Sequence, residues 1–199
     1  MFRRTISSLL QRSTRICLIH SSVGFRNMSQ IPKALVFDLD GCVWDPELYQ
    51  LMGGSPFKSL PNGDVEDSSG EKIYLMGDVR TIMNELKNDA KWSGTVIAIA
   101  SKCTELKWAE ECLEKFKINE TQTLMSVFRK DLQEIYWDNK QKHLKKISDT
   151  SGIPLKDMIF FDNQMDNCRD VSQLLTLLYV EIAVISSTNL CLFRCHRLV

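Results

Sequence analysis

The sequence predicts an α/β fold in which a three-layer, Rossmann-like parallel sheet is flanked by helices and carries a minimal β-hairpin cap. Three apolar runs, Ala34–Phe37, Thr95–Ala100 and Met158–Phe161, have the length and bounding turn residues of strands buried on both faces. Polar residues follow each run, and patterns typical of helices lie between the runs. This alternation is typical of a parallel sheet with right-handed crossovers.

Three helices are predicted between these strands. The first follows Asp78, which we expect to cap it, and the third follows Lys140 and ends at Gly152. Their apolar residues recur at spacings of three and four, which gives one apolar face per helix. These residues are Val79, Ile82, Met83 and Leu86 in the first helix, Leu106, Ala109, Leu113 and Phe116 in the second, and Leu144 and Ile147 in the third.

The remaining elements have weaker patterns. Residues 45–76 are rich in turn residues, and Asn62–Gly63 is a strong hairpin signal, so we expect a small hairpin flap over the strand ends. A short third strand is expected over Thr121–Phe128, and Leu177–Ile185 predicts one more. Cys191–His196 lacks the pattern of a closing strand, so we expect an atypical tail over 186–199 that leaves part of the sheet edge exposed.

The length of 199 residues predicts one domain, residues 31–185, between two tails. Residues 1–30 are rich in serine and contain no acidic residue. This N-terminal extension resembles a mitochondrial transit peptide, which predicts a mitochondrial location. The alternatives are a disordered extension or a start at Met28, with a cytoplasmic location. The arginines of the extension are Arg3, Arg4, Arg12, Arg15 and Arg26.

Composition narrows the classes of partner. The formal net charge is zero, so we expect neither nucleic acid nor a membrane as partner. We also expect a monomer. The apolar stretch after Thr176 is interrupted by Glu181 and is too short for a membrane span. The seven cysteines form no C-x-x-C pair and no zinc spacing, which favours reduced thiols in an intracellular compartment.

Asp38 and Asp40 follow the first predicted strand directly. Residues two apart on an extended segment point the same way, so their carboxylates converge at the edge where open α/β sheets bind ligands. Converging carboxylates repel each other unless a cation lies between them, and Mg²⁺ prefers such oxygen ligands. The alternative to a metal-binding pair is that Asp38 and Asp40 belong to a polar turn that ends a strand.

Four separated motifs together resemble the magnesium-dependent phosphatase family of the haloacid dehalogenase (HAD) superfamily. They are Phe37–Trp44, Ile97–Glu105, Glu134–Lys140 and Met158–Gln164. The resemblance implies a HAD-like phosphatase domain that requires Mg²⁺ and forms an aspartyl-phosphate. It implies Asp38 as the nucleophile, Asp40 as the general acid and base, Leu39, Asp40, Ser101, Lys102 and Lys140 as phosphate-binding residues, and Asp38, Asp40, Asp162 and Asn163 as metal ligands.

Two positions depart from the family pattern. Cys42 replaces the usual Thr, and it lacks the following arginine-rich phosphate loop of a thiol phosphatase. Asn163 replaces the second acid of the metal loop, which removes one negative charge, although Asp166 lies where other branches of the superfamily have an acid. Because affinity for a hard cation follows ligand charge, we predict weak metal binding.

The resemblance therefore predicts a Mg²⁺-dependent hydrolase of phosphate monoesters. Its substrates would be phosphotyrosine-like groups on a phosphorylated protein, or small sugar or fructosamine phosphates. The alternative, favoured by Asn163 and the unusual tail, is a catalytically weak or inactive relative that binds phosphate as a binding module. A metal-nucleotide transferase that uses the Asp-x-Asp pair is disfavoured, because no sugar-nucleotide pocket can be identified in the sequence.

Overall fold

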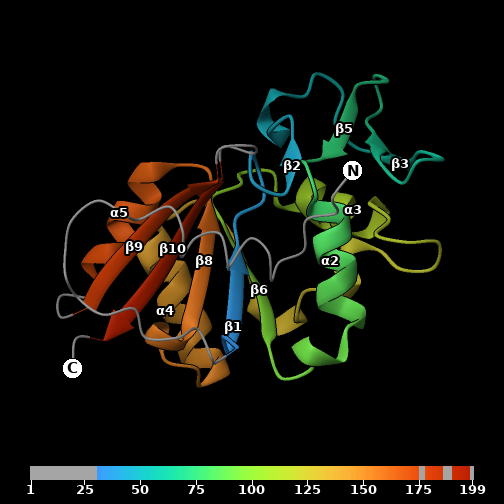
Figure 1. Ribbon diagram of the computed structural model, residues 1–199. Coiled ribbons are helices and arrows are strands. Elements are labelled where there is room, and N and C mark those ends of the chain that lie inside the picture. The colour runs from blue at the N-terminus through green and yellow to red at the C-terminus, as the bar shows by residue number, and fades with distance from the viewer. Residues whose placement is uncertain (1–30, 175–177, 186–189, 198–199) are drawn as a thin grey trace.

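The computed structural model describes residues 31–174, 178–185 and 190–197, and the side chains of residues 31–174. The predicted transit peptide, residues 1–30, lies outside the described residues. A six-stranded sheet forms the centre, in the order β7-β6-β1-β8-β10-β9 (Figure 1). The first four are parallel and the last two antiparallel. Their bounds are β7 Gln133–Ile135, β6 Val96–Ser101, β1 Ala34–Phe37, β8 Met158–Asp162, β10 Leu190–Arg197 and β9 Leu178–Ile185.

Helices cover both faces of this sheet, which confirms the predicted three-layer α/β class. On β1, Leu35 and Phe37 pack with α2 and α3, whereas Ala34 and Val36 pack with α4 and α5. This division follows from the two-residue period of a strand, and it explains why the strand is apolar throughout. The helices are α2 Val79–Asn88, α3 Leu106–Lys115, α4 Lys140–Ser151 and α5 Met165–Gln173.

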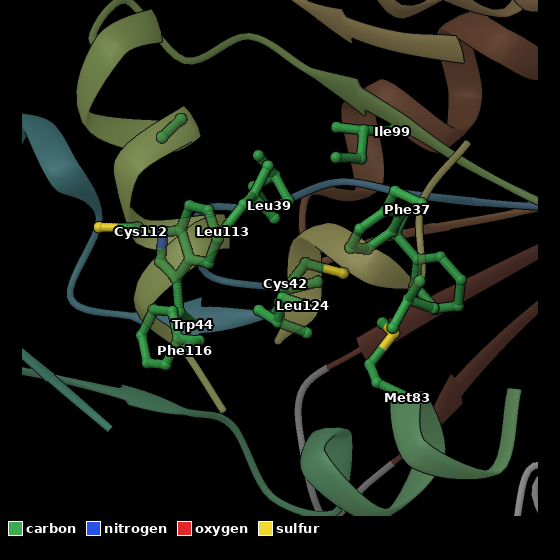
Figure 2. Packing of buried hydrophobic residues seen from close by; sticks show 14 of the residues in the cluster. Phe37, Leu39, Cys42, Trp44, Met83, Ile99, Cys112, Leu113, Phe116 and Leu124 are labelled. Carbon is green, nitrogen blue, oxygen red and sulfur yellow. The ribbon is translucent and has the colours of Figure 1, made fainter. Parts of the chain in front are cut away.

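The larger core cluster lies between the sheet, the helices α2 and α3, and the loop 38–44 that follows β1 (Figure 2). The Trp44 and Phe116 rings stack with centroids 5.7 Å apart, and both side chains are fully buried. Burial of one such side chain contributes about 1.5–3 kcal/mol. The loop that follows β1 is therefore held against α3 by its own aromatic residue.

The predicted flap is a small antiparallel sheet in the order β2-β5-β4-β3. Asp67 ties its turns together, accepting hydrogen bonds from the backbone N–H groups of Gly53, Gly54, Ser69 and Glu71. Burial raises the pKa of Asp67, but a hydrogen bond from the Ser69 hydroxyl, together with these N–H groups, outweighs burial and lowers the pKa to about 2. The strands are β2 Trp44–Asp45, β3 Lys58–Ser59, β4 Val65–Glu66 and β5 Lys72–Leu75.

Glu111 on α3 anchors the flap to the main domain. Its carboxylate accepts hydrogen bonds from the Ser55 hydroxyl at 2.7 Å and from the Phe57 backbone N–H at 2.8 Å. Trp108, one turn earlier, packs edge-on against the Phe57 ring with centroids 6.0 Å apart. One face of α3 therefore fixes the position of the flap relative to the sheet.

Three local predictions were wrong. Thr121–Phe128 is not a strand, because the Asn119 side chain accepts hydrogen bonds from the backbone N–H groups of Thr121 and Gln122 and holds a turn there. The short 3-10 helix Leu124–Ser126 follows, and the third parallel strand is instead β7. Asp78 precedes α2 without a side-chain cap hydrogen bond, whereas Gly152 ends α4 as predicted, with φ of 69°.

The third error concerns the C-terminal segment. Leu178–Ile185 forms β9 as expected, but Leu190–Arg197 also forms a strand, β10, which pairs with β8 and β9. Since backbone pairing to a buried neighbour creates this strand, the side-chain pattern of Cys191–His196 was a poor guide. The β8 edge is therefore paired rather than exposed. Within the three described ranges, no helix has the length and apolar character to cross a membrane.

Candidate active site

The polar residues predicted for the site converge at the carboxyl edge of the parallel strands. Asp38 follows β1, while Ser101 and Asp162 are the last residues of the two strands that flank β1. The register aligns Phe37 with both Ile99 and Phe161, so the three strands end at nearly the same level. Convergence is thus a result of parallel pairing between segments far apart in sequence.

Lys140 lies between the two acids. Its Nζ is 2.7 Å from Asp38 Oδ1 and 3.3 Å from Asp162 Oδ2, and it donates a hydrogen bond to the Ala100 carbonyl oxygen at 2.7 Å. The lysine side chain is 0% exposed. Its position follows from helix capping, because the Asn139 side chain accepts a hydrogen bond from the Lys142 N–H and starts α4 at Lys140.

Lys140 is the cation that faces two buried acids, Asp38 and Asp162. Asp162 is 0% exposed. Burial, followed by the charge of Asp38, raises the pKa of Asp162 to about 6, although Lys140 opposes this rise. One ammonium therefore only partly compensates two buried carboxylates, and further positive charge at this place would be stabilising.

Asp40 lies on the flap side of the same loop. Its Oδ1 accepts hydrogen bonds from Trp44 Nε1 at 2.7 Å and from the Leu48 N–H at 3.1 Å. Burial raises the pKa of Asp40, and these hydrogen bonds offset that effect in part. Asp40 is thus held in a fixed orientation, in surroundings that favour its protonated form more than water does.

The turn between Asp38 and Trp44 is tight. The Leu39 carbonyl accepts from the backbone N–H groups of Cys42 and Val43, and Gly41 has φ of 69°, a conformation that favours glycine. The buried Cys42 thiol donates to the Phe161 carbonyl at 3.7 Å. Burial raises the pKa of Cys42, which opposes thiolate formation and agrees with a supporting role for this side chain.

The residues that could hold a metal are the four that the resemblance implied, Asp38, Asp40, Asp162 and Asn163. Asn163 Oδ1 is buried and has no hydrogen-bond partner, and a Cβ on Gly41 would lie 2.4 Å from Asn163 Nδ2. A buried amide oxygen without a donor is a fitting ligand for a hard cation. Among the residues whose side chains are described, no group of three or more His, Cys, Asp or Glu residues could hold a metal. The fit to a hard cation rests instead on the partnerless Asn163 oxygen next to the buried Asp162.

Asp166 does not supply the missing charge. Its side chain is 90% exposed and forms an ion pair with Arg169 on the outer face of α5. Although Asp166 lies where other branches of the superfamily have an acid, the first turn of α5 turns this residue toward solvent.

The structure also reveals site residues that sequence reasoning missed. Lys102 Nζ donates to Asn167 Oδ1 at 2.6 Å, and Asn167 Nδ2 lies 3.0 Å from Asp162 Oδ2. The buried His143 ring contacts the carbonyl oxygens of Tyr136 and Asn139, which bracket the loop before Lys140. The Asn167 contact with Lys102 joins residues 65 apart in the chain, and His143 contacts backbone oxygens four and seven residues earlier, so no residue pattern marks either contact. Ser101 is buried and accepts from the Cys103 N–H at 3.4 Å.

Comparisons with known proteins identify the family of this chain. Residues 30–186 match a family model described as acid phosphatase. Human magnesium-dependent phosphatase 1 is 32% identical over 148 residues, which cover 74% of this chain and 76% of the relative. A HAD-like hydrolase superfamily protein of Schizosaccharomyces pombe is 30% identical over 148 residues, which cover 73% of this chain and 83% of that protein.

A solved structure was also matched, the N-terminal, phosphatase-domain part of a Bacteroides fragilis protein in complex with Mg. It has a TM-score of 0.49 and 20% identity, and the match covers 73% of this chain and 34% of that chain. The family match and the two sequence relatives confirm the resemblance drawn from the four motifs. This chain belongs to the HAD-like acid phosphatase family.

Proposed function

We propose that this protein is a Mg²⁺-dependent phosphatase that hydrolyses phosphate monoesters through an aspartyl-phosphate on Asp38. The observation that most supports this proposal is the gathering of Asp38, Lys140 and Asp162 within 3.3 Å contacts at the carboxyl edge of the sheet. The proposed roles of nucleophile, phosphate-binding cation and metal ligand require these three groups to lie close together. The family membership supports phosphate-ester chemistry at that point.

Mg²⁺, held by Asp38, Asp40, Asp162 and Asn163, would supply charge neutralisation for the phosphoryl oxygens. Asp38 attacks phosphorus with a carboxylate oxygen, and the bond from phosphorus to the leaving oxygen breaks. Asp40 donates its proton to that leaving oxygen. It then accepts a proton from the water that attacks phosphorus, which regenerates Asp38 and releases inorganic phosphate.

The surroundings of these residues suit the proposed roles. Burial raises the pKa of Asp40, which favours the protonated acid needed in the first step. Lys140 already contacts Asp38 and neutralises part of the charge that develops during attack. Trp44 and Leu48 hold the Asp40 carboxylate by hydrogen bonds, so its orientation is fixed before the reaction begins.

We propose phosphotyrosine-like groups on a phosphorylated protein, or small sugar or fructosamine phosphates, as the substrate class. The small size of the flap supports this range, because its four strands have two to four residues each and form no separate domain. Turnover of a phosphotyrosine peptide, compared with that of a sugar phosphate at equal concentration, distinguishes the two classes.

A second candidate is a catalytically weak relative that binds phosphate without turnover. It is favoured by the low negative charge of the metal loop, where Asn163 offers a neutral amide and Asp166 faces solvent. In this candidate, Lys140 alone compensates Asp38 and Asp162. Phosphate would then bind by charge and hydrogen bonds, without efficient attack by Asp38.

The test measures hydrolysis of a chromogenic aryl phosphate with MgCl₂, by the wild-type protein, Asp38→Asn and the matched exposed-acid control Asp166→Asn. We expect turnover by wild type and Asp166→Asn, and a loss of at least about 10³-fold in Asp38→Asn. Turnover that survives Asp38→Asn rules out the aspartyl-phosphate mechanism. If none of the three proteins turns over substrate while beryllofluoride still binds wild type, the binding module is favoured.

We also propose import into mitochondria directed by residues 1–30, with the cytoplasm as the alternative location. The test fuses the full chain, and the chain from Met28, to a fluorescent protein. Mitochondrial signal from the full chain alone supports import, and diffuse signal from both overturns it.

A further inference from the structure

Lys102, Asn167 and Asp162 form a hydrogen-bonded chain beside the proposed metal site. Lys102 Nζ donates to Asn167 Oδ1 at 2.6 Å. Asn167 Nδ2 lies 3.1 Å from Asp162 Oδ1 and 3.0 Å from Asp162 Oδ2. Asn167 is 3% exposed and its contacts with Asp162 are buried, whereas its contact with Lys102 is partly buried. A buried amide group left without a partner would be costly.

The chemistry of the two ends determines the orientation of the Asn167 amide. An ammonium can only donate hydrogen bonds, and a carboxylate can only accept them. The amide must therefore turn its oxygen to Lys102 and its NH₂ group to Asp162. The opposite orientation would place two donors against each other at one end and two acceptors at the other.

We infer that Lys102 and Asn167 are positioning residues for Asp162, in which Lys102 fixes the Asn167 amide and the amide orients the Asp162 carboxylate toward Mg²⁺. This inference rests on the proposed Mg²⁺-dependent function. It assigns Lys102 to the metal loop, a role different from the phosphate contact that the family resemblance implied.

The composition of the metal loop makes this orientation important. Asn163 contributes no charge and Asp166 faces solvent, so Asp162 is the one acid of the loop Asp162–Asp166 that faces the site. The Gln164 N–H also donates to Asp162 Oδ1, at 2.7 Å. This donor is a backbone group, so its hydrogen bond to Asp162 does not depend on the charge of Lys102. Loss of the outer-shell partner of a metal ligand typically weakens metal binding by about 10- to 100-fold.

A double-mutant cycle on Mg²⁺ binding tests the inference. The proteins are wild type, Lys102→Met, Asn167→Leu and the double variant, and Kd is obtained from the rise of Tm with MgCl₂ concentration, which also measures weak binding. A cycle is needed because removal of Lys102 also removes a positive charge that repels the cation. That Coulomb effect is present in both backgrounds and cancels in the cycle.

We expect Asn167→Leu to raise the Mg²⁺ Kd by at least about tenfold. The factor by which Lys102→Met changes Kd should be at least about threefold more unfavourable when Asn167 is present than when it is Leu. Arg169→Met, which removes an exposed cation from the same helix, should change Kd by the same factor in both backgrounds. At saturating MgCl₂, Asn167→Leu should recover most of the wild-type kcat, which a general folding defect would not allow.

Equal factors for Lys102→Met in the two backgrounds would overturn the inference while leaving the proposed function intact. Absence of Mg²⁺ binding by wild type would instead overturn the proposed function, and the inference with it. If Asn167→Leu fails to fold, Asn167→Ala removes the same amide with a smaller side chain and replaces it in the cycle.

Discussion

Replacing Lys140 with methionine tests the electrostatic balance on which the site depends. The lysine side chain is 0% exposed and the Asp38 and Asp162 side chains are 9% and 0% exposed. Lys140→Met keeps much of the side-chain volume but leaves two buried acids without their cation. Removal of one partner from a buried ion pair costs about 3–5 kcal/mol, so we expect a loss of that size in the free energy of unfolding.

The loss should depend on pH and on metal. The pKa of Asp162 is raised to about 6, so the folded state binds this proton more tightly than the unfolded state, and stability falls as pH rises through about 6. Because Lys140 opposes the rise in the pKa of Asp162, its removal makes the fall larger and extends it to higher pH. The deficit of Lys140→Met should therefore be full near pH 8 and shrink toward pH 5. Excess MgCl₂ should restore part of it at pH 8, because the cation replaces the lost charge.

The assay is urea unfolding, followed by circular dichroism, at pH 8 with a chelator, at pH 8 with MgCl₂ and at pH 5 with a chelator. The matched control is Lys142→Met. This change removes an exposed lysine of α4 that pairs with Asp138, just before the helix, and should change stability by less than about 0.5 kcal/mol. If Lys140→Met is as stable as wild type at pH 8 without metal, the account of the buried charges is refuted.

Three further predictions follow from the metal loop and the flap. Asn163→Asp adds a negative charge at the buried oxygen without a partner and should lower the Mg²⁺ Kd by about tenfold; an unchanged Kd in the same Tm titration means that Asn163 is not a ligand. Asp67→Asn weakens hydrogen bonds to a charged acceptor and should lower the free energy of unfolding by about 2 kcal/mol at pH 7, as measured with urea. Because the pKa of Asp67 is lowered to about 2, wild type should lose this stabilisation as pH falls from about 4 to about 2, and a gap that persists at pH 2 would contradict this cause. Gly54→Ala places a Cβ 2.1 Å from Trp108 at φ of 69° and should lower Tm by an amount equivalent to about 1–3 kcal/mol, whereas Gly70→Ala, whose Cβ would meet nothing within 4 Å, should cost less.

Local pattern was sufficient for the repeated elements and for the nucleophile loop. The continuous apolar runs identified β1, β6 and β8, because a strand buried on both faces needs apolar residues at every position. Apolar spacing likewise identified α2, α3 and α4. The position of Asp38 and Asp162 at strand ends was also readable, since parallel strands in one sheet end at a common edge.

Side-chain partners and burial that the residue pattern does not reveal determined the rest. Thr121–Phe128 has a strand-like composition, but the Asn119 side chain competes for its backbone and makes a turn. Asp166 has the residue type of a metal ligand, but the direction of α5 turns it to solvent. Lys140 and Lys142 look alike in a lysine-rich segment, yet one is fully buried between acids and the other is exposed. Sequence gives the periodicity and chemical character of side chains, whereas burial and partners depend on how strands and helices from remote parts of the chain pack together.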